Sequence, residues 1–162
     1  MNPIRRAATV LGLMFALASM FVAPAQASVT GPTGVVLRAE SAQEPPHEYS
    51  PQNPAYENVT AGGRFTGQVS FGEPNLRYAW GVKIAPDIIA GIVGRVLENT
   101  ITFCDGKEVA RSNHLEPADY MFHGSNVVDP ACQNYILDGT LTFTYQGAMG
   151  TIYIHDNFVV RP

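Results

Sequence analysis

Residues 140–145 read Thr-Leu-Thr-Phe-Thr-Tyr, an unbroken alternation of hydroxyl-bearing and large apolar side chains. Successive side chains of a β-strand point to opposite faces, so this pattern predicts a strand with one buried face and one solvated face. Half-buried strands are typical of antiparallel sheets, because parallel strands are usually covered on both faces. The stretch therefore favours an antiparallel β protein over the other fold classes.

The same period of two recurs from residue 64 onward. It is found at 65–71, 78–84, 100–103 and 151–154. Thr100 and Thr102 are expected on the solvated face, where threonine suits a strand. A bulge near Asp156 is predicted before the last strand continues over 158–160. We expect a mainly β fold, with one domain over 63–162 built as a single antiparallel β-sandwich or small β-barrel of about six to eight strands.

A hairpin is predicted at Asp105-Gly106, a dipeptide that favours tight turns between strands. A two-residue turn would place Phe103 opposite Glu108. A three-residue loop with a bulge would place it opposite Val109 instead. We favour the longer loop, because it buries Phe103 beside another apolar side chain.

Residues 86–97 break the alternation, since their apolar side chains recur with the spacing of one helical face. Pro86 and Asp87 suit the first turn of a helix. Gly91 and Gly94 weaken a helix by about 2 kcal/mol together. The pattern predicts at most one short helix over about 86–97, with two strands meeting at Gly91 as the alternative.

Residues 112–134 have no clear periodicity and predict a long crossover loop with a short strand at 120–122. Cys104 and Cys132 are the only cysteines of the chain. In an exported protein such a pair favours a disulfide, worth about 3.6 kcal/mol by the chain-entropy model. We expect this bridge to hold the 112–134 loop against the end of the 101–104 strand.

Residues 1–27 have the layout of a signal peptide. Arg5 and Arg6 precede an apolar stretch, and Ala25-Gln26-Ala27 provides small residues at the cleavage site. The apolar stretch is shorter than the roughly 20 residues that span a membrane. We therefore expect a secreted or periplasmic protein without membrane anchoring after signal cleavage.

Residues 28–62 hold five prolines and only two aromatic side chains. Such a segment buries too little apolar surface to offset the entropy cost of ordering it. It is predicted to be a flexible Pro-rich segment, in which residues 35–37 are the one stretch suited to an added edge strand.

The charge balance argues against a nucleic-acid partner. The whole chain has a formal net charge of −4. Without Arg5 and Arg6 of the signal peptide, eight basic side chains face fourteen acidic ones, a charge of −6. Phosphate backbones are bound by basic surfaces, and an acidic chain of this kind disfavours them.

Six polar residues are the candidates for a functional site: His114, Glu116, Asp119, His123, His155 and Asp156. The first four crowd into ten residues, yet they form neither the His-Glu-x-x-His zinc signature nor a calcium loop. The Gly-x-Ser-x-Gly signature of serine hydrolases does not occur either. The sequence thus predicts no catalytic residues, no metal and no cofactor.

We therefore expect a non-enzymatic binding or interaction module with a protein or carbohydrate partner. The alternative is a small exported enzyme, a hydrolase or isomerase, that uses His155 or His123 with a nearby carboxylate. An enzyme should hold one of these histidines within hydrogen-bond reach of Asp119 or Asp156 in a concave site. A binding module should instead present a flat or grooved exposed apolar patch.

Overall fold

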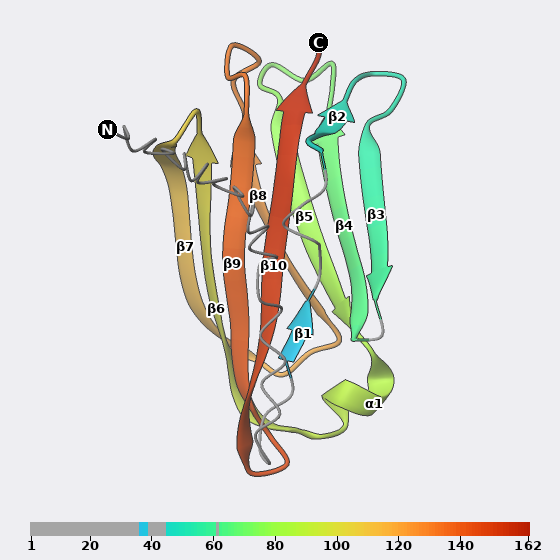
Figure 1. Cartoon of the computed structure of the whole chain (residues 1–162), viewed down its shortest axis with the longest axis vertical. Helices are drawn as coiled ribbons and strands as arrows, with labels where there is room; N and C mark the ends of the chain where they lie inside the picture. The colour runs from blue at the N-terminus through green and yellow to red at the C-terminus, as the bar shows by residue number, and fades with distance from the viewer. Residues whose placement is uncertain (1–35, 39–44, 61) are drawn as a thin grey trace, which may run out of the picture.

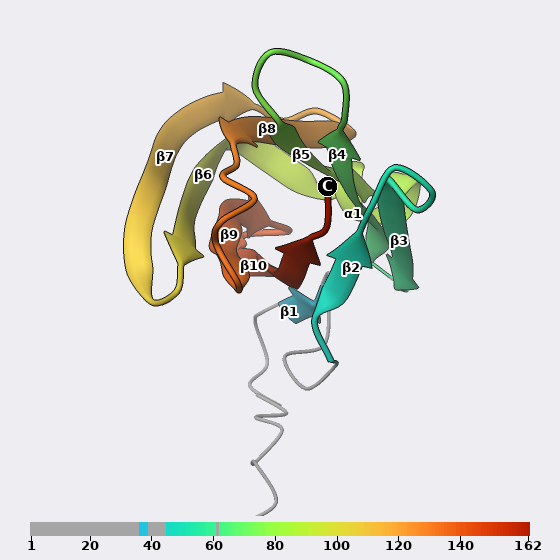
Figure 2. The same ribbon diagram turned by 90° about the horizontal axis from the view of Figure 1, so that it is seen from above.

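The computed structural model of the protein describes residues 36–38, 45–60 and 62–162. Across these residues the chain forms ten strands and one four-residue helix (Figure 1). The strands make two sheets that face each other, and neither sheet closes into a barrel (Figure 2). The mainly β prediction is confirmed, and the two-sheet arrangement fits a β-sandwich.

The larger sheet has six strands in the order β1-β10-β9-β6-β7, with β2 also paired to β10. Its strands are β1 (Val36–Arg38), β2 (His47–Tyr49), β6 (Ile92–Cys104), β7 (Lys107–Pro117), β9 (Tyr135–Tyr145) and β10 (Ala148–Val160). The smaller sheet has four strands in the order β3-β4-β5-β8. Its strands are β3 (Ala55–Thr60), β4 (Gly63–Ser70), β5 (Arg77–Ile84) and β8 (Met121–Val127).

The core lies between the sheets and is formed by the apolar members of the alternating stretches. Phe71 and Tyr145, which were predicted to face inward, are only partly buried. Most of the predicted inward side chains are almost fully buried: Phe65, Val69, Tyr78, Trp80, Val82, Ile84, Leu141, Phe143, Ile152 and Ile154. Strand β6 is the exception, because Thr100 and Thr102 are buried while Ile101 and Phe103 are only half-buried. The inner face of β6 is polar there, and Asn126 Nδ2 of the other sheet donates to Thr102 Oγ1 at 3.0 Å.

Part of the range 28–62 requires a correction. Residues 45–60 carry β2 and β3 rather than a flexible segment, and Tyr49 is 1% exposed in the core. Sheet pairing and the burial of Tyr49 order this stretch despite its prolines. The predicted edge strand at 35–37 is found as β1, Val36–Arg38.

The purely antiparallel prediction is also incomplete. Both β1 and β2 run parallel to β10 along the same edge, whereas every other pairing is antiparallel. The structure has ten strands where six to eight were expected. The difference arises because β1, β2 and β3 come from residues 28–62, which were predicted to lie outside the domain.

The hairpin at Asp105-Gly106 has the shorter turn, so the predicted three-residue loop is wrong. Asp105 and Gly106 adopt φ angles of 47° and 80°, the positive values of a type I′ turn. Phe103 pairs with Glu108, and the register then shifts so that Val109 is the extra residue of a bulge. Val109 is half exposed, so its burial beside Phe103 does not occur.

The predicted helix is much shorter than 86–97. The helix α1 covers only Pro86–Ile89, and β6 begins at Ile92. The β-branched residues of this stretch suit a strand, and Ile92 pairs with Tyr145 of β9. The chain thus turns once beyond β5 and enters the other sheet.

Two further expectations also change. Most of 112–127 is strand, in β7 and β8, so the crossover between the sheets is confined to residues 118–120. Strand β10 continues through Asp156 without a register shift against β9, so the predicted bulge does not occur.

The predicted signal peptide at 1–27 lies outside the described residues. None of the helices within those residues has the length and apolar character needed to cross a membrane.

Candidate functional site

The outer face of the smaller sheet has a hollow of about 460 Å³, which we call the β5 hollow. Its floor is β5, where Tyr78, Trp80 and Val82 point into the core and leave Ala79 and Gly81 on the outer face. A Cβ atom on Gly81 would meet nothing closer than Met121 Cε at 3.7 Å. The hollow therefore exists because two small residues stand side by side along the middle strand.

Hydrogen-bonding side chains stand on both sides of this floor. In the sheet register Gly81 lies between Thr66 of β4 and His123 of β8. Ala79 lies in the same way between Gln68 and Ser125. Gln68, His123 and Ser125 are exposed. The complete lining is Thr66, Gln68, Ala79, Trp80, Gly81, Lys83, Met121, His123, Gly124 and Ser125.

A second polar group, which we call the Asp156 cluster, is buried between the sheets. The Asp156 side chain is fully buried, and its Oδ2 accepts hydrogen bonds from the hydroxyls of Tyr49, at 3.0 Å, and Tyr78. His47 Nδ1 lies 2.9 Å from Asp156 Oδ1, within hydrogen-bonding distance. The His47 ring stacks on Tyr56 with centroids 3.5 Å apart.

The cluster joins four strands from two sheets. Asp156 lies on β10, Tyr78 on β5, His47 and Tyr49 on β2, and Tyr56 on β3. A buried carboxyl group is stable only when donors surround it, and this one has three. Asp156 is closed off from solvent, whereas the His47 side chain remains 14% exposed. The hydrogen bonds of Asp156 link the two sheets to each other.

Strand β4 leaves room for the cluster through Gly67. A Cβ atom at this position would lie 2.2 Å from the Tyr49 hydroxyl and 2.8 Å from Asp156 Oδ2. Both separations are shorter than nonbonded atoms allow. The approach of the two tyrosines to Asp156 therefore requires glycine at residue 67.

The candidate pair His155 and Asp156 is split by the pleat of β10. Asp156 points into the core, whereas His155 lies on the outer face of the larger sheet. There His155 Nδ1 is 2.6 Å from Asp138 Oδ1, directly across from it on β9. The carboxyl partner of His155 is thus Asp138, which the sequence analysis did not single out.

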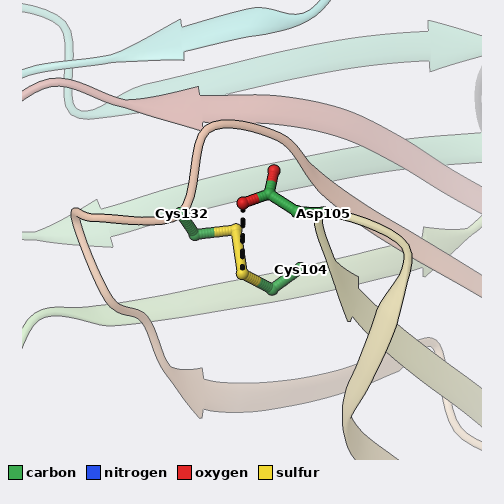
Figure 3. Close-up of side chains that lie close together, drawn as sticks. All are labelled: Cys104, Asp105 and Cys132. Carbon is green, nitrogen blue, oxygen red and sulfur yellow. Dashed lines mark hydrogen bonds between the residues drawn. A yellow bond between two sulfur atoms is a disulfide. The ribbon is translucent and has the colours of Figure 1, made fainter.

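The four crowded candidates do not come together. His114 and Glu116 lie on β7 of the larger sheet, Asp119 lies in the crossover, and His123 lies on β8 of the smaller sheet. Their closeness in sequence reflects the crossing of the chain between the sheets. Among the described residues, the one group of three potential ligands that gathers its donor atoms is Cys104, Asp105 and Cys132 (Figure 3).

That group is a structural one, because Cys104 and Cys132 form the predicted disulfide with Cα atoms 5.8 Å apart. The sulfurs are therefore not thiolates able to ligate a metal. Asp105 beside them accepts hydrogen bonds from the backbone nitrogens of Gln133, at 3.3 Å, and Asn134, at 2.9 Å. The bridge and this carboxylate together fasten the loop before β9 to the end of β6.

The same loop is closed from the inside by Tyr135. Its hydroxyl accepts from the backbone nitrogen of Asp129 at 2.6 Å and donates to the Asp129 carbonyl oxygen at 3.0 Å. Burial raises the pKa of the Tyr135 phenol above its ordinary value. On the surface of β7, the hydrogen bond from Arg111 lowers the pKa of Glu108.

The fold and site define a disulfide-bonded, two-sheet β protein with an open hollow on one sheet. The chain matches no protein-family model, and no curated protein has significant similarity to it.

Of the residues that form the floor and walls of the hollow, only His123 was among the candidates predicted from sequence. The signal for them was the alternation of 77–83, in which Ala79 and Gly81 are the outward partners of large buried residues.

Proposed function

We propose that the protein is an exported, non-enzymatic binding module and that the β5 hollow receives a carbohydrate ligand. The observation that supports this most is a floor of two small residues, Ala79 and Gly81, between two rows of hydrogen-bonding side chains. Ligand sites are typically concave and combine a smooth surface with a few well-placed polar groups. Export is supported by the layout of residues 1–27 and by the disulfide.

A carbohydrate fits this surface better than a protein does. Protein interfaces depend on exposed aromatic or arginine anchors at their centre. The centre of the hollow offers Gly81 and Ala79, and the one aromatic residue of its lining, Trp80, is 3% exposed. A sugar chain instead carries many hydroxyls, which Gln68, His123 and Ser125 can bind from both sides.

The walls are also held in place by the core. Strands β4 and β5 have their alternate residues buried, and β8 is anchored in the core by Phe122, so the polar side chains stand on paired β-structure. Little ordering entropy is lost when a ligand settles on such a surface.

The test fills the hollow without touching the core. The mature chain, residues 28–162, is applied to a glycan array as wild type, as Ala79→Leu and as Ala55→Leu. Ala55 is a matched control, because it is exposed at the edge strand β3 of the same sheet and does not line the hollow. We expect a bound glycan whose signal falls at least tenfold in Ala79→Leu and is retained in Ala55→Leu. An array without any bound glycan, or equal binding by both variants, overturns the proposal.

A second candidate function rests on the pair His155 and Asp138. A carboxylate that fixes Nδ1 leaves Nε2 as the nitrogen for proton transfer, the arrangement of a general base. The supporting observation is the 2.6 Å contact on the outer face of the larger sheet. A panel of ester, peptide and glycoside substrates tests it: an activity lost in His155→Ala supports an enzyme, and an unchanged activity rejects this pair.

A further inference from the structure

We infer that the ligand of the β5 hollow is an anionic carbohydrate chain that is held at its two ends by Arg77 and Lys83. This inference rests on the proposed function and adds the charge and the length of the ligand. It is drawn from the distribution of charge on the outer face of the smaller sheet.

The outer face of the smaller sheet is basic, although the chain as a whole is acidic. The outward residues of the four strands follow from their alternation and register. Their charged members are Glu57, Arg64, Arg77 and Lys83. The face therefore carries three permanent cations and one acid, whereas the whole chain has ten basic and fourteen acidic residues. Glu73, Asp87, Asp119 and Asp129, the acids nearest along the chain, lie outside the four strands.

Two of these cations remain available to bind a ligand. Arg64 Nη1 lies 3.4 Å from Glu57 Oε2, so this pair is largely neutralised within the sheet. Arg77 and Lys83 are both exposed, and neither takes part in a salt bridge within the described residues. An approaching ligand thus meets a net positive charge at these two positions.

The two cations lie near opposite ends of the same strand, β5. The outer face of β5 presents Arg77, Ala79, Gly81 and Lys83 in succession, each two residues from the next. Six residues of strand span about 20 Å. The hollow lies between the cations, and Lys83 belongs to its lining. A ligand that touches both ends must therefore be extended and carry negative charge at intervals along its length.

These features favour an acidic polysaccharide over other polyanions. Nucleic acids and anionic membranes are usually bound by larger groups of cations, because each contact with a single phosphate or headgroup is weak. An acidic peptide supplies charge but few of the hydroxyls that Gln68, His123 and Ser125 are placed to bind. Uronate or sulfate groups on a sugar backbone satisfy both the cations and the polar walls.

Isothermal titration calorimetry with defined probes tests the inference. The probes are a galacturonate hexamer, a chondroitin sulfate hexamer, a neutral galactose hexamer and a hexaglutamate peptide. We expect one of the two acidic saccharides to bind, with an affinity that falls as NaCl is raised, because salt screens exposed charges. Lys83→Gln and Arg77→Gln should each weaken binding about threefold to fivefold. Lys107→Gln, an exposed lysine at the hairpin of the other sheet, should leave the affinity unchanged.

The outcomes separate this inference from the proposed function. If the neutral hexamer binds as well as the acidic ones and Lys83→Gln has no effect, the anionic ligand is rejected, while loss of binding in Ala79→Leu still supports the hollow as the site. Tight binding of hexaglutamate alone shows an acidic peptide ligand and overturns the carbohydrate assignment. If none of the three saccharides binds, the inference fails, and the glycan array then decides the proposed function separately.

Discussion

The Asp156 cluster makes a large and specific contribution to stability that can be measured. In Asp156→Ala, the hydroxyls of Tyr49 and Tyr78 and Nδ1 of His47 all lose this acceptor. Each buried hydrogen bond to a carboxyl group is worth about 1.5–3 kcal/mol, and both tyrosines are at most 1% exposed. These contributions are not additive, because the three groups share one acceptor. Removing one member of a buried charged network typically costs about 3–5 kcal/mol, so we expect Asp156→Ala to lower the free energy of unfolding by that amount, a large share of the stability of a typical domain.

Urea denaturation followed by tryptophan fluorescence measures this change, since Trp80 is buried in the same core. Asp138→Ala serves as the control, because its carboxylate is half exposed and binds only on the sheet surface. We expect that variant to change the free energy of unfolding by less than about 1 kcal/mol.

A double-mutant cycle shows whether the loss arises from the hydrogen bonds themselves. Tyr78→Phe should cost about 1–2 kcal/mol in the wild-type background and much less in the Asp156→Ala background, because its acceptor is already gone. Equal costs in the two backgrounds, or an Asp156→Ala variant as stable as Asp138→Ala, would refute the reasoning.

Three further changes test other parts of the fold. Gly67→Ala drives a methyl group into Asp156 and Tyr49, so chemical denaturation should show a loss of about 2–3 kcal/mol, and a loss below 0.5 kcal/mol contradicts the contact. Replacing Cys104 and Cys132 by serine should cost about 3 kcal/mol in the same assay, and no change would mean that the bridge does not constrain the unfolded chain. Tyr135 has a raised pKa in the folded state, so its contribution is complete below its unfolded pKa of about 10 and is lost as the pH rises through the folded value. Tyr135→Phe should therefore flatten the fall of stability as the pH rises above about 10, and an unchanged slope would show that the pKa of this phenol is not raised in the folded protein.

Much of the core could be predicted from sequence because alternation reports burial directly. Every apolar residue predicted to face inward at 78–84 is buried, since β5 is the second strand of a sheet whose inner face is fully covered. Alternation of apolar and polar residues does not predict burial correctly where the two faces of a strand have similar environments. Strand β6 lies beside the exposed edge strand β7, and Glu98 and Thr100 are buried there beside Ser112, whose Oγ donates to Glu98 at 2.9 Å.

The errors at the ends of elements have another physical origin. The segment at 45–60 is poor in apolar residues, and it becomes ordered through backbone pairing with β10 and β4, which composition does not report. The helix predicted over 86–97 had the correct spacing of apolar residues. Its β-branched side chains nonetheless pair with β9, because tertiary contacts outweigh a weak local preference.

The candidate site was harder to predict because it depends on register. His123 and Gln68 are far apart in sequence, and they share a hollow only because β8 and β4 both pair with β5. The same holds for Asp156, whose donors come from β2 and β5. Single-sequence reasoning recovered the disulfide because only one pairing of two cysteines exists.

The buried cluster and the open hollow depend on each other through one strand. Tyr78 binds Asp156 on the inner face of β5, and its two neighbours, Arg77 and Ala79, stand on the outer face. Ala79 forms part of the floor of the hollow, and Arg77 lies beyond it along the strand. Because the peptide backbone of β5 is shared, fixing Tyr78 against the larger sheet also fixes where Arg77 and Ala79 stand. The strand fixes the separation of the backbone positions of Arg77 and Lys83. For the anionic ligand that we propose, this separation would favour one spacing of ligand charges over another. If the β5 hollow binds the ligand that we propose, the polar groups in the core would support selectivity at a surface that they do not touch.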